Sequence, residues 1–253
     1  MNTETDDLIQ EYVARGGDFH DWRPSYSVAP TDPAVIVREH VDADSGETIR
    51  ELSLARWDVP SPPKAPQRPI INARMEKLSD RFWSGSFSNN RCIVPMLGYY
   101  EWTGAAGSKQ PHFIHGDGLL SAAGVYMNEK LPEGGWRRSF AVVTREARDA
   151  SGEVHDRMPA FLGPELVDEW LRPESLTQKG DADASRGRRE QLIAALGETS
   201  TAVAATLSSH PVHRRLSSVR TLDPYDASII EPVDDLEAKA DPVSDRAAHP
   251  GLF

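Results

Sequence analysis

The feature that most constrains this fold is a series of short apolar runs between Trp83 and Thr144. Glycine and proline residues separate the runs, which are too short to be core helices and have the composition of strands. They are residues 91–95, 98–102, 112–115, 122–127 and 140–144. The middle of the chain is therefore predicted to form mostly antiparallel strands joined by tight turns.

The N-terminal half adds a predicted helix and a hairpin. Residues 5–15 place Leu8 and Tyr12 on one apolar face, and Gly16 and Gly17 would end that helix. Residues 34–40 and 48–57 alternate as two paired strands would. Further helices are expected at 163–171, where Pro164 suits the first turn, and at 189–196. The fold class is therefore α+β, with mainly antiparallel sheets and flanking short helices.

Other segments predict loops and a tail. Residues 60–69 hold five prolines, too many for a regular element. Residues 173–190 are polar and charged and are expected to be a mobile insertion. We expect one domain over residues 1–233 and a disordered acidic tail over 234–253.

Composition sets broad limits on partners and compartment. The chain has 253 residues and a net charge of −11, which argues against wholesale, non-specific binding of nucleic acid. A local basic groove needs only a few arginines, and the middle of the chain supplies them. The single cysteine excludes an internal disulfide, and neither a signal peptide nor an apolar run of about 20 residues is visible. We expect a cytoplasmic protein that does not enter membranes.

Glu101 is the first candidate for chemistry. It lies between Tyr100 and Trp102 in a run that otherwise resembles a buried strand. Burial disfavours the charged form of a carboxyl group, which suits a general acid or base working near neutral pH. The alternative is a glutamate on the polar face of an alternating strand.

Two further segments carry candidate polar groups. In a strand, Asn72 and Arg74 would share one face, where an amide and a guanidinium could position a substrate and bind a phosphate. The alternative is an edge strand with a solvent-facing side. His155, in a polar loop beside Asp156 and Arg157, could shuttle protons or contact phosphate, although most histidines are surface residues.

Other catalytic patterns are weak or missing. His210 and His213 are closely spaced but have no third metal ligand nearby, so no metal site is predicted. Cys92 lies in an apolar strand and is expected to fill the core. The sequence has neither a Gly-x-Ser-x-Gly elbow nor a glycine-rich phosphate loop.

Several segments, taken together and in order, resemble motifs of the SRAP (SOS response-associated peptidase) family. They are residues 23–31, Arg56-Trp57, Ile71-Asn72-Ala73-Arg74-Met75-Glu76, residues 91–95, Gly98-Tyr99-Tyr100-Glu101-Trp102, His155-Asp156-Arg157-Met158-Pro159 and residues 209–212. Ser27 and Asp58 stand where the family usually has Asn and Gly. The resemblance covers about residues 21–233 and implies a barrel-like core.

The resemblance also implies a function. SRAP proteins link themselves covalently to abasic sites in single-stranded DNA during the response to DNA damage. An N-terminal cysteine captures the open-chain aldehyde as a thiazolidine, without a cofactor. By this resemblance Asn72 would hold the N-terminal residue, Glu101 would act as acid or base, and His155 would assist opening of the sugar and reversal of the crosslink. Phosphate contacts would come from Arg74, Arg81 and Arg157, and Trp57 would pack near the unstacked strand.

The start of the sequence departs from the family pattern. Position 2 is Asn2, and the family's Met-Cys-Gly-Arg-Phe start is missing. We expect that start to lie a few codons upstream, the other explanation being a noncatalytic relative. As written, the chain is expected to be a monomer that binds single-stranded or abasic DNA without a covalent bond. The alternatives are a single-stranded DNA-binding module without activity and, less favoured, a hydrolase that depends on Cys92. The family's peptidase label fits removal of a short leader before the cysteine.

Overall fold

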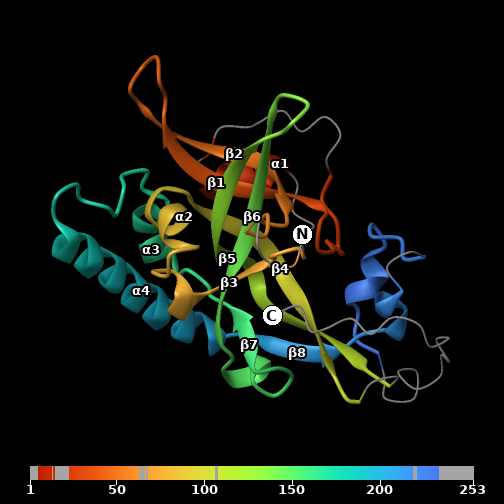
Figure 1. Ribbon diagram of the computed structural model, residues 1–253. Coiled ribbons are helices and arrows are strands. Elements are labelled where there is room, and N and C mark those ends of the chain that lie inside the picture. The colour runs from red at the N-terminus through yellow and green to blue at the C-terminus, as the bar shows by residue number, and fades with distance from the viewer. Residues whose placement is uncertain are drawn as a thin grey trace.

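The computed structural model describes residues 5–12, 14, 23–62, 66, 68–105, 108–218 and 221–233. Within these residues an eight-stranded sheet carries helices along its flank, which confirms the predicted α+β class (Figure 1). The strands are β1 (Pro33–Val41), β2 (Thr48–Trp57), β3 (Asn72–Arg74), β4 (Arg91–Thr103), β5 (Gln110–Lys130), β6 (Trp136–Glu146), β7 (Arg157–Pro159) and β8 (Ser208–Pro211). The α-helices are α1 (Thr5–Tyr12), α2 (Ser84–Asn89), α3 (Pro164–Leu171) and α4 (Ala182–Ala204). Short 3₁₀ turns are η1 (Met75–Lys77), η2 (Asp149–Ser151), η3 (Arg214–Ser217) and η4 (Ala227–Ile230).

The sheet is mainly antiparallel, as predicted. The β1–β2 hairpin and the β4–β5 and β5–β6 pairs are antiparallel, whereas β2 and β3 pair with β6 in parallel. The strands β1, β2, β6, β5 and β4 pair in a ring, but β1–β4 and β2–β6 each join through only two residue pairs. The core is therefore a strongly curved, barrel-like sheet and not a regular closed barrel.

Two pairs of predicted runs merge into single long strands. Runs 91–95 and 98–102 both belong to β4, whose register shifts between Met96 and Gly98. Runs 112–115 and 122–127 both belong to β5. A Cβ atom at Gly98 would lie 2.5 Å from the Ile114 carbonyl oxygen, closer than any real contact. Glycine therefore lets β4 approach β5 at the irregularity instead of ending the strand.

Both faces of the sheet are buried. On β1, Val35 and Val37 join a cluster with the helical residues Leu8, Phe87 and Trp170. Ala34 and Ile36, which alternate with them, join a second cluster with Cys92, Phe140 and Met158. Because successive strand residues point to opposite faces, the alternation in β1 supplies both cores. Cys92 is fully buried, as its apolar context predicted.

The prediction of a mobile insertion over residues 173–190 is wrong for its second half. The helix predicted at 189–196 is much longer and begins at Ala182. The Asp181 side chain caps it by accepting a hydrogen bond from the Ala184 amide at 2.8 Å. Leu192 and Leu196 anchor the helix in the core, while the charged residues that suggested a loop lie mostly on its exposed side.

The remaining predicted elements are found close to their expected bounds. α1, the β1–β2 hairpin and α3 match residues 5–15, 34–57 and 163–171, and Leu8 and Tyr12 are buried. The proline-rich loop is closed by a bridge between Val59 and Ile70. Gly16, Gly17 and the predicted tail at 234–253 lie outside the described residues. None of the described helices is long and apolar enough to cross a membrane.

Candidate active site

Glu101 and His155 come together although 54 positions separate them in the sequence. Glu101 lies on β4 opposite His112 of β5, and its side chain is fully buried. Its Oε1 atom is 4.0 Å from Nδ1 of His155, whose side chain is 23% exposed. The structure thus pairs a buried carboxyl group with a partly accessible imidazole, the combination that proton transfer to a bound substrate needs.

The loop that carries His155 is fastened on its N-terminal side. The Ser151 carbonyl accepts a hydrogen bond from the His155 amide at 2.9 Å. The Ser151 hydroxyl also hydrogen-bonds the hydroxyl of Tyr99, two residues before Glu101 on β4. Burial, the larger effect, raises the pKa of Tyr99, and the charge of Glu101 raises it further. Tyr99 is therefore a neutral hydroxyl that ties the His155 loop to the strand of Glu101.

Asn72 lies at the start of β3, which pairs with β6 so that Asn72 is opposite Val142. The preceding carbonyl, of Ile71, accepts hydrogen bonds from the Val142 amide at 3.0 Å and from Nε1 of Trp57 at 2.8 Å. Asn72 is half-buried and Arg74 exposed, with buried Ala73 between them. This alternation agrees with the prediction that Asn72 and Arg74 share a face.

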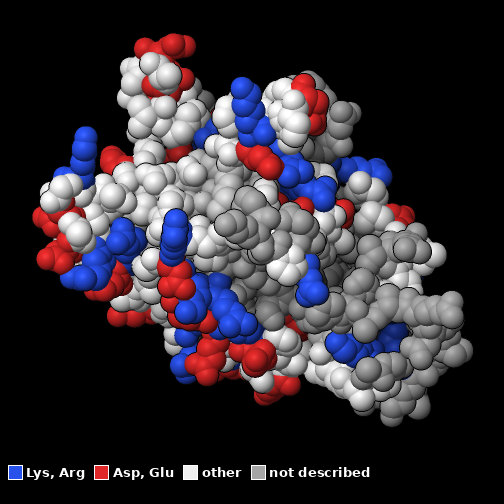
Figure 2. Space-filling model, in the orientation of Figure 1, with Lys and Arg blue, Asp and Glu red and all other residues white. Residues whose placement is uncertain are grey.

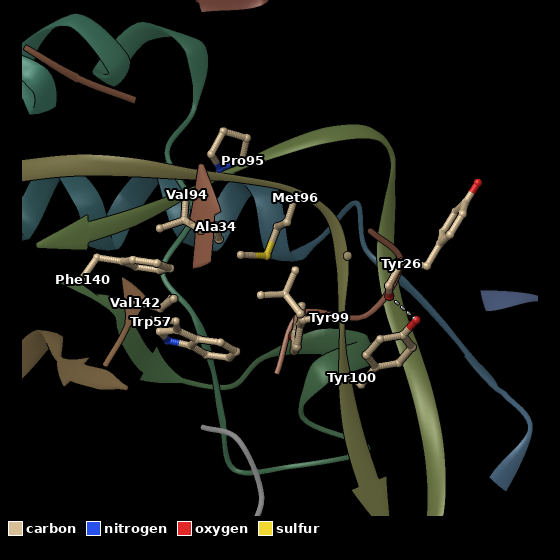
Figure 3. Close-up of a pocket in the computed structure, with 12 residues that line it drawn as sticks. Tyr26, Ala34, Trp57, Val94, Pro95, Met96, Tyr99, Tyr100, Phe140 and Val142 are labelled. Carbon is tan, nitrogen blue, oxygen red and sulfur yellow. Dashed lines mark hydrogen bonds between the residues drawn. The ribbon is translucent and has the colours of Figure 1, made fainter. Parts of the chain in front are cut away.

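An apolar hollow with a volume of about 80 Å³ adjoins these strands. Figure 3 shows Trp57 and Phe140 on one side of it and Tyr99 and Tyr100 further along β4. The Trp57 and Phe140 rings stack with centroids 6.4 Å apart and an interplanar angle of 10°. Trp57 is only 7% exposed, so it forms part of the wall of the hollow.

The three arginines predicted to bind phosphate have different surroundings. Arg74 and Arg81 are exposed, whereas the Arg157 side chain is only 16% exposed and forms an ion pair with Glu76. On the face shown in Figure 2, basic and acidic side chains are interspersed. This local mixture agrees with the net charge of −11, since neither favours indiscriminate binding of polyanions.

His210 and His213 are used locally. Nε2 of His210 lies 2.8 Å from the Ile230 carbonyl oxygen, and Nδ1 of His213 accepts from the Arg215 amide at the start of η3. Among the described residues, no three His, Cys, Asp or Glu side chains are grouped so that they could hold a metal ion.

Three residues around Glu101 and His155 were given no role from the sequence: Tyr99, Glu76 and Ser151. Tyr99 and Glu76 lie inside the quoted motifs, so their place in those motifs was a usable signal. Ser151 lies in a polar loop with no distinguishing pattern. Its contact with Tyr99 depends on how η2 packs against β4, which no local pattern encodes.

The sequence matches the family described as "SOS response associated peptidase (SRAP)" over residues 1–219. It is 31% identical over 201 residues to the abasic site processing protein YoqW of Bacillus subtilis, covering 72% of this chain and 85% of that protein. It is 29% identical over 213 residues to the abasic site processing protein YedK of Escherichia coli, covering 82% and 84%. The abasic site processing protein HMCES of Xenopus tropicalis is 29% identical over 189 residues, 62% of this chain and 56% of that longer protein.

Solved structures support the fold. A protein from Bacteroides thetaiotaomicron superimposes with a TM-score of 0.68 at 19% identity, covering 92% of this chain and 97% of that one. A phage-related protein from Bordetella bronchiseptica gives a TM-score of 0.58 at 24% identity, covering 84% and 92%. Since the family match spans well over half of the chain, this protein belongs to the SOS response-associated peptidase family.

Proposed function

We propose that this protein recognises and processes abasic sites in single-stranded DNA. The observation that carries the proposal is the buried Glu101 carboxyl group 4.0 Å from His155, in a chain related to abasic site processing proteins. An abasic site exposes a sugar hemiacetal that must open to an aldehyde before it reacts. Ring opening removes a proton from the anomeric hydroxyl and adds a proton to the ring oxygen. An adjacent base and an adjacent acid catalyse these two transfers.

The resemblance to the family suggests the role of each group. Glu101 exchanges protons with the sugar, and His155 contacts the opened sugar and assists both ring opening and reversal of the covalent product. In a chain that carries the family's N-terminal cysteine, Asn72 would hold that residue. Arg74 and Arg81, which are exposed, bind the flanking phosphates, and Trp57 packs near the unstacked strand.

In the covalent reaction of the family, an N-terminal amine condenses with the aldehyde and releases water as an imine forms. The thiolate of the same cysteine then adds to the imine carbon, and the nitrogen takes up a proton as the thiazolidine ring closes. Position 2 of the present sequence is Asn2, which has no thiol. For the chain as written we therefore propose recognition of the abasic site without this ring closure.

Binding of the chain to fluorescent single-stranded oligonucleotides tests the proposal. One oligonucleotide carries a natural abasic site and its match is intact. We expect tighter binding to the abasic strand, loss of that preference in Glu101→Gln, and no heat-stable adduct on a denaturing gel. Equal affinity for both strands, unchanged by Glu101→Gln, would contradict the proposal.

That contrary result describes the second candidate function, a single-stranded DNA-binding module without activity. The exposed Arg74 and Arg81 favour it, because phosphate contacts alone give affinity that falls steeply with salt and ignores the missing base. Repeating the titration at several salt concentrations separates the two functions.

A further inference from the structure

The Arg157 guanidinium is already engaged within the protein. Its Nη1 donates to Oε1 of Glu76 at 2.9 Å, and its Nη2 donates to Oε2 of Glu76 at 3.2 Å. Nη2 also donates to the Thr144 carbonyl at 2.8 Å. A two-pronged pair of this kind fixes the plane of the guanidinium as well as its position. To bind a phosphate through both Nη atoms, Arg157 would have to give up a bond to Glu76 or to Thr144.

The backbone of the same arginine holds His155. The Arg157 amide donates a hydrogen bond to Nδ1 of His155 at 3.0 Å. When Nδ1 of the neutral imidazole accepts this bond, the ring proton is on Nε2. The Arg157 carbonyl oxygen at 3.4 Å and Oδ1 of Asp156 at 3.1 Å are the groups near Nδ1 that would favour the other tautomer. β7, which begins at Arg157, pairs with β6 through the register Glu146–Arg157. Both the side chain and the amide of Arg157 are therefore fixed, one by Glu76 and Thr144 and the other by His155.

Glu76 is suited to hold an arginine in this way. It lies in η1, directly after β3, the strand that carries Asn72 and Arg74. Burial alone would raise the pKa of Glu76. The hydrogen bond and charge of Arg157 nevertheless hold this pKa below its usual value of 4.5. Glu76 is thus ionised at neutral pH, and it connects the turn after β3 with the loop of His155.

We propose that Glu76 is a positioning residue of this site: through Arg157 it keeps His155 in the orientation and Nε2–H tautomer that face the abasic sugar. The inference rests on the proposed function for its biological meaning, but the contacts that carry it are independent of DNA. Arg157 then contributes to recognition mainly by holding His155, and Arg74 and Arg81 supply the phosphate contacts.

A competing role for Glu76 makes the opposite prediction. If Glu76 merely blocked a phosphate-binding arginine, its removal would free Arg157 and strengthen binding to every single-stranded oligonucleotide. If Glu76 positions His155, its removal lowers the preference for abasic over intact strands and leaves binding to intact strands nearly unchanged. We expect that preference to fall about tenfold in Glu76→Ala, which is within the cost of a small displacement of a reacting group.

Nuclear magnetic resonance of the histidine rings provides the test that does not need DNA. ¹⁵N–¹H correlation spectra report which ring nitrogen of His155 carries the proton. We expect predominantly the Nε2–H form in the unmodified chain, a mixture of tautomers in Glu76→Ala, and an intermediate spectrum in Glu76→Gln, which can still accept one hydrogen bond. Asp80→Ala, which removes the exposed Lys77–Asp80 ion pair close to Glu76 in the sequence, is the matched control and should change nothing.

The outcomes separate the inference from the proposed function. An unchanged His155 spectrum in Glu76→Ala, or stronger binding to intact strands, would overturn the positioning role. If the unmodified chain shows no abasic preference while the His155 spectrum still responds to Glu76→Ala, the proposed function fails and the positioning role stands. Urea unfolding of each variant confirms that it is folded, and Glu76→Gln is the variant to use if Glu76→Ala is not.

Discussion

The two ends of β4 hold charged side chains that are similarly buried and differently used. Arg91, at the start of the strand, is 4% exposed, and Glu101, near its end, is 0% exposed. Arg91 donates hydrogen bonds to the carbonyl oxygens of five residues, namely Phe87, Ser88, Trp170, Arg172 and Glu174. Glu101 instead lies near a histidine that solvent can reach.

If the proposed function is right, this one strand serves both stability and chemistry. The carbonyls that surround Arg91 come from the last turns of α2 and α3 and the residues just after α3, where backbone oxygens lack partners within their helix. The guanidinium satisfies them and joins both helices to the sheet, although burial lowers its own pKa to about 10. Glu101 instead faces the partly exposed imidazole of His155.

The largest expected effect concerns Arg91 and its contribution to stability. Arg91→Met removes the donors to the carbonyl oxygens of the buried residues Phe87 and Trp170, and each buried polar group left unpaired costs about 1–3 kcal/mol. We expect the free energy of unfolding, measured with urea, to fall by about 3 kcal/mol or more. The control is Arg137→Met, which breaks an ion pair whose two side chains are each 38% exposed. A similar loss in both variants would show that burial of Arg91 does not matter.

The second prediction concerns the irregularity between the two ends of β4. In Gly98→Ala the new methyl group would meet the Ile114 carbonyl oxygen, which belongs to the backbone of β5 and has little freedom to move. Forcing an atom into a packed core costs about 1–3 kcal/mol, and we expect a loss in that range by urea unfolding. At Gly118 a Cβ atom meets nothing within 4 Å, so Gly118→Ala should be nearly neutral.

Gly98→Ala should also affect function, because the glycine directly precedes Tyr99 and lies three residues before Glu101. A shift of this backbone would move both side chains away from Ser151 and His155. We expect the preference for abasic DNA to weaken at temperatures where the variant is still fully folded. A folded variant with unchanged preference would mean that the site tolerates displacement of β4.

The third prediction tests the proposed role of Glu101 in proton exchange. Glu101→Gln keeps the size and shape of the side chain but removes its ability to exchange a proton at neutral pH. We therefore expect a modest change in stability together with loss of abasic preference, the reverse of Arg91→Met. A change as large as that of Arg91→Met would remove the distinction between the two ends.

Much of this arrangement could be predicted from the sequence, for identifiable reasons. The strands around Glu101 have strong apolar patterns, and the motif Gly98-Tyr99-Tyr100-Glu101-Trp102 identified the residue itself. Arg91 was considered only as one of several basic residues, because its partners are backbone carbonyls that no sequence pattern marks. The start of α4 was missed for a related reason: its exposed residues are polar, and its anchor, Leu192, is a full ten residues after Ala182.

The smallest expected effect comes from a charged residue that is much more exposed than Arg91 or Glu101. The Glu76 side chain is 50% exposed, so its pair with Arg157 is screened by solvent and should contribute at most about 0.5 kcal/mol to stability. Because the folded pKa of Glu76 lies below its unfolded value of 4.5, this contribution is present above that pH and is lost as the pH falls through the folded pKa. The difference in the free energy of unfolding between the unmodified chain and Glu76→Gln should therefore be present at neutral pH and vanish in strong acid. Added salt should reduce it as well. A difference that grows in acid would mean that Glu76 is held by something other than the charge of Arg157. The small effect expected from the exposure of Glu76 would then be the wrong explanation for this residue.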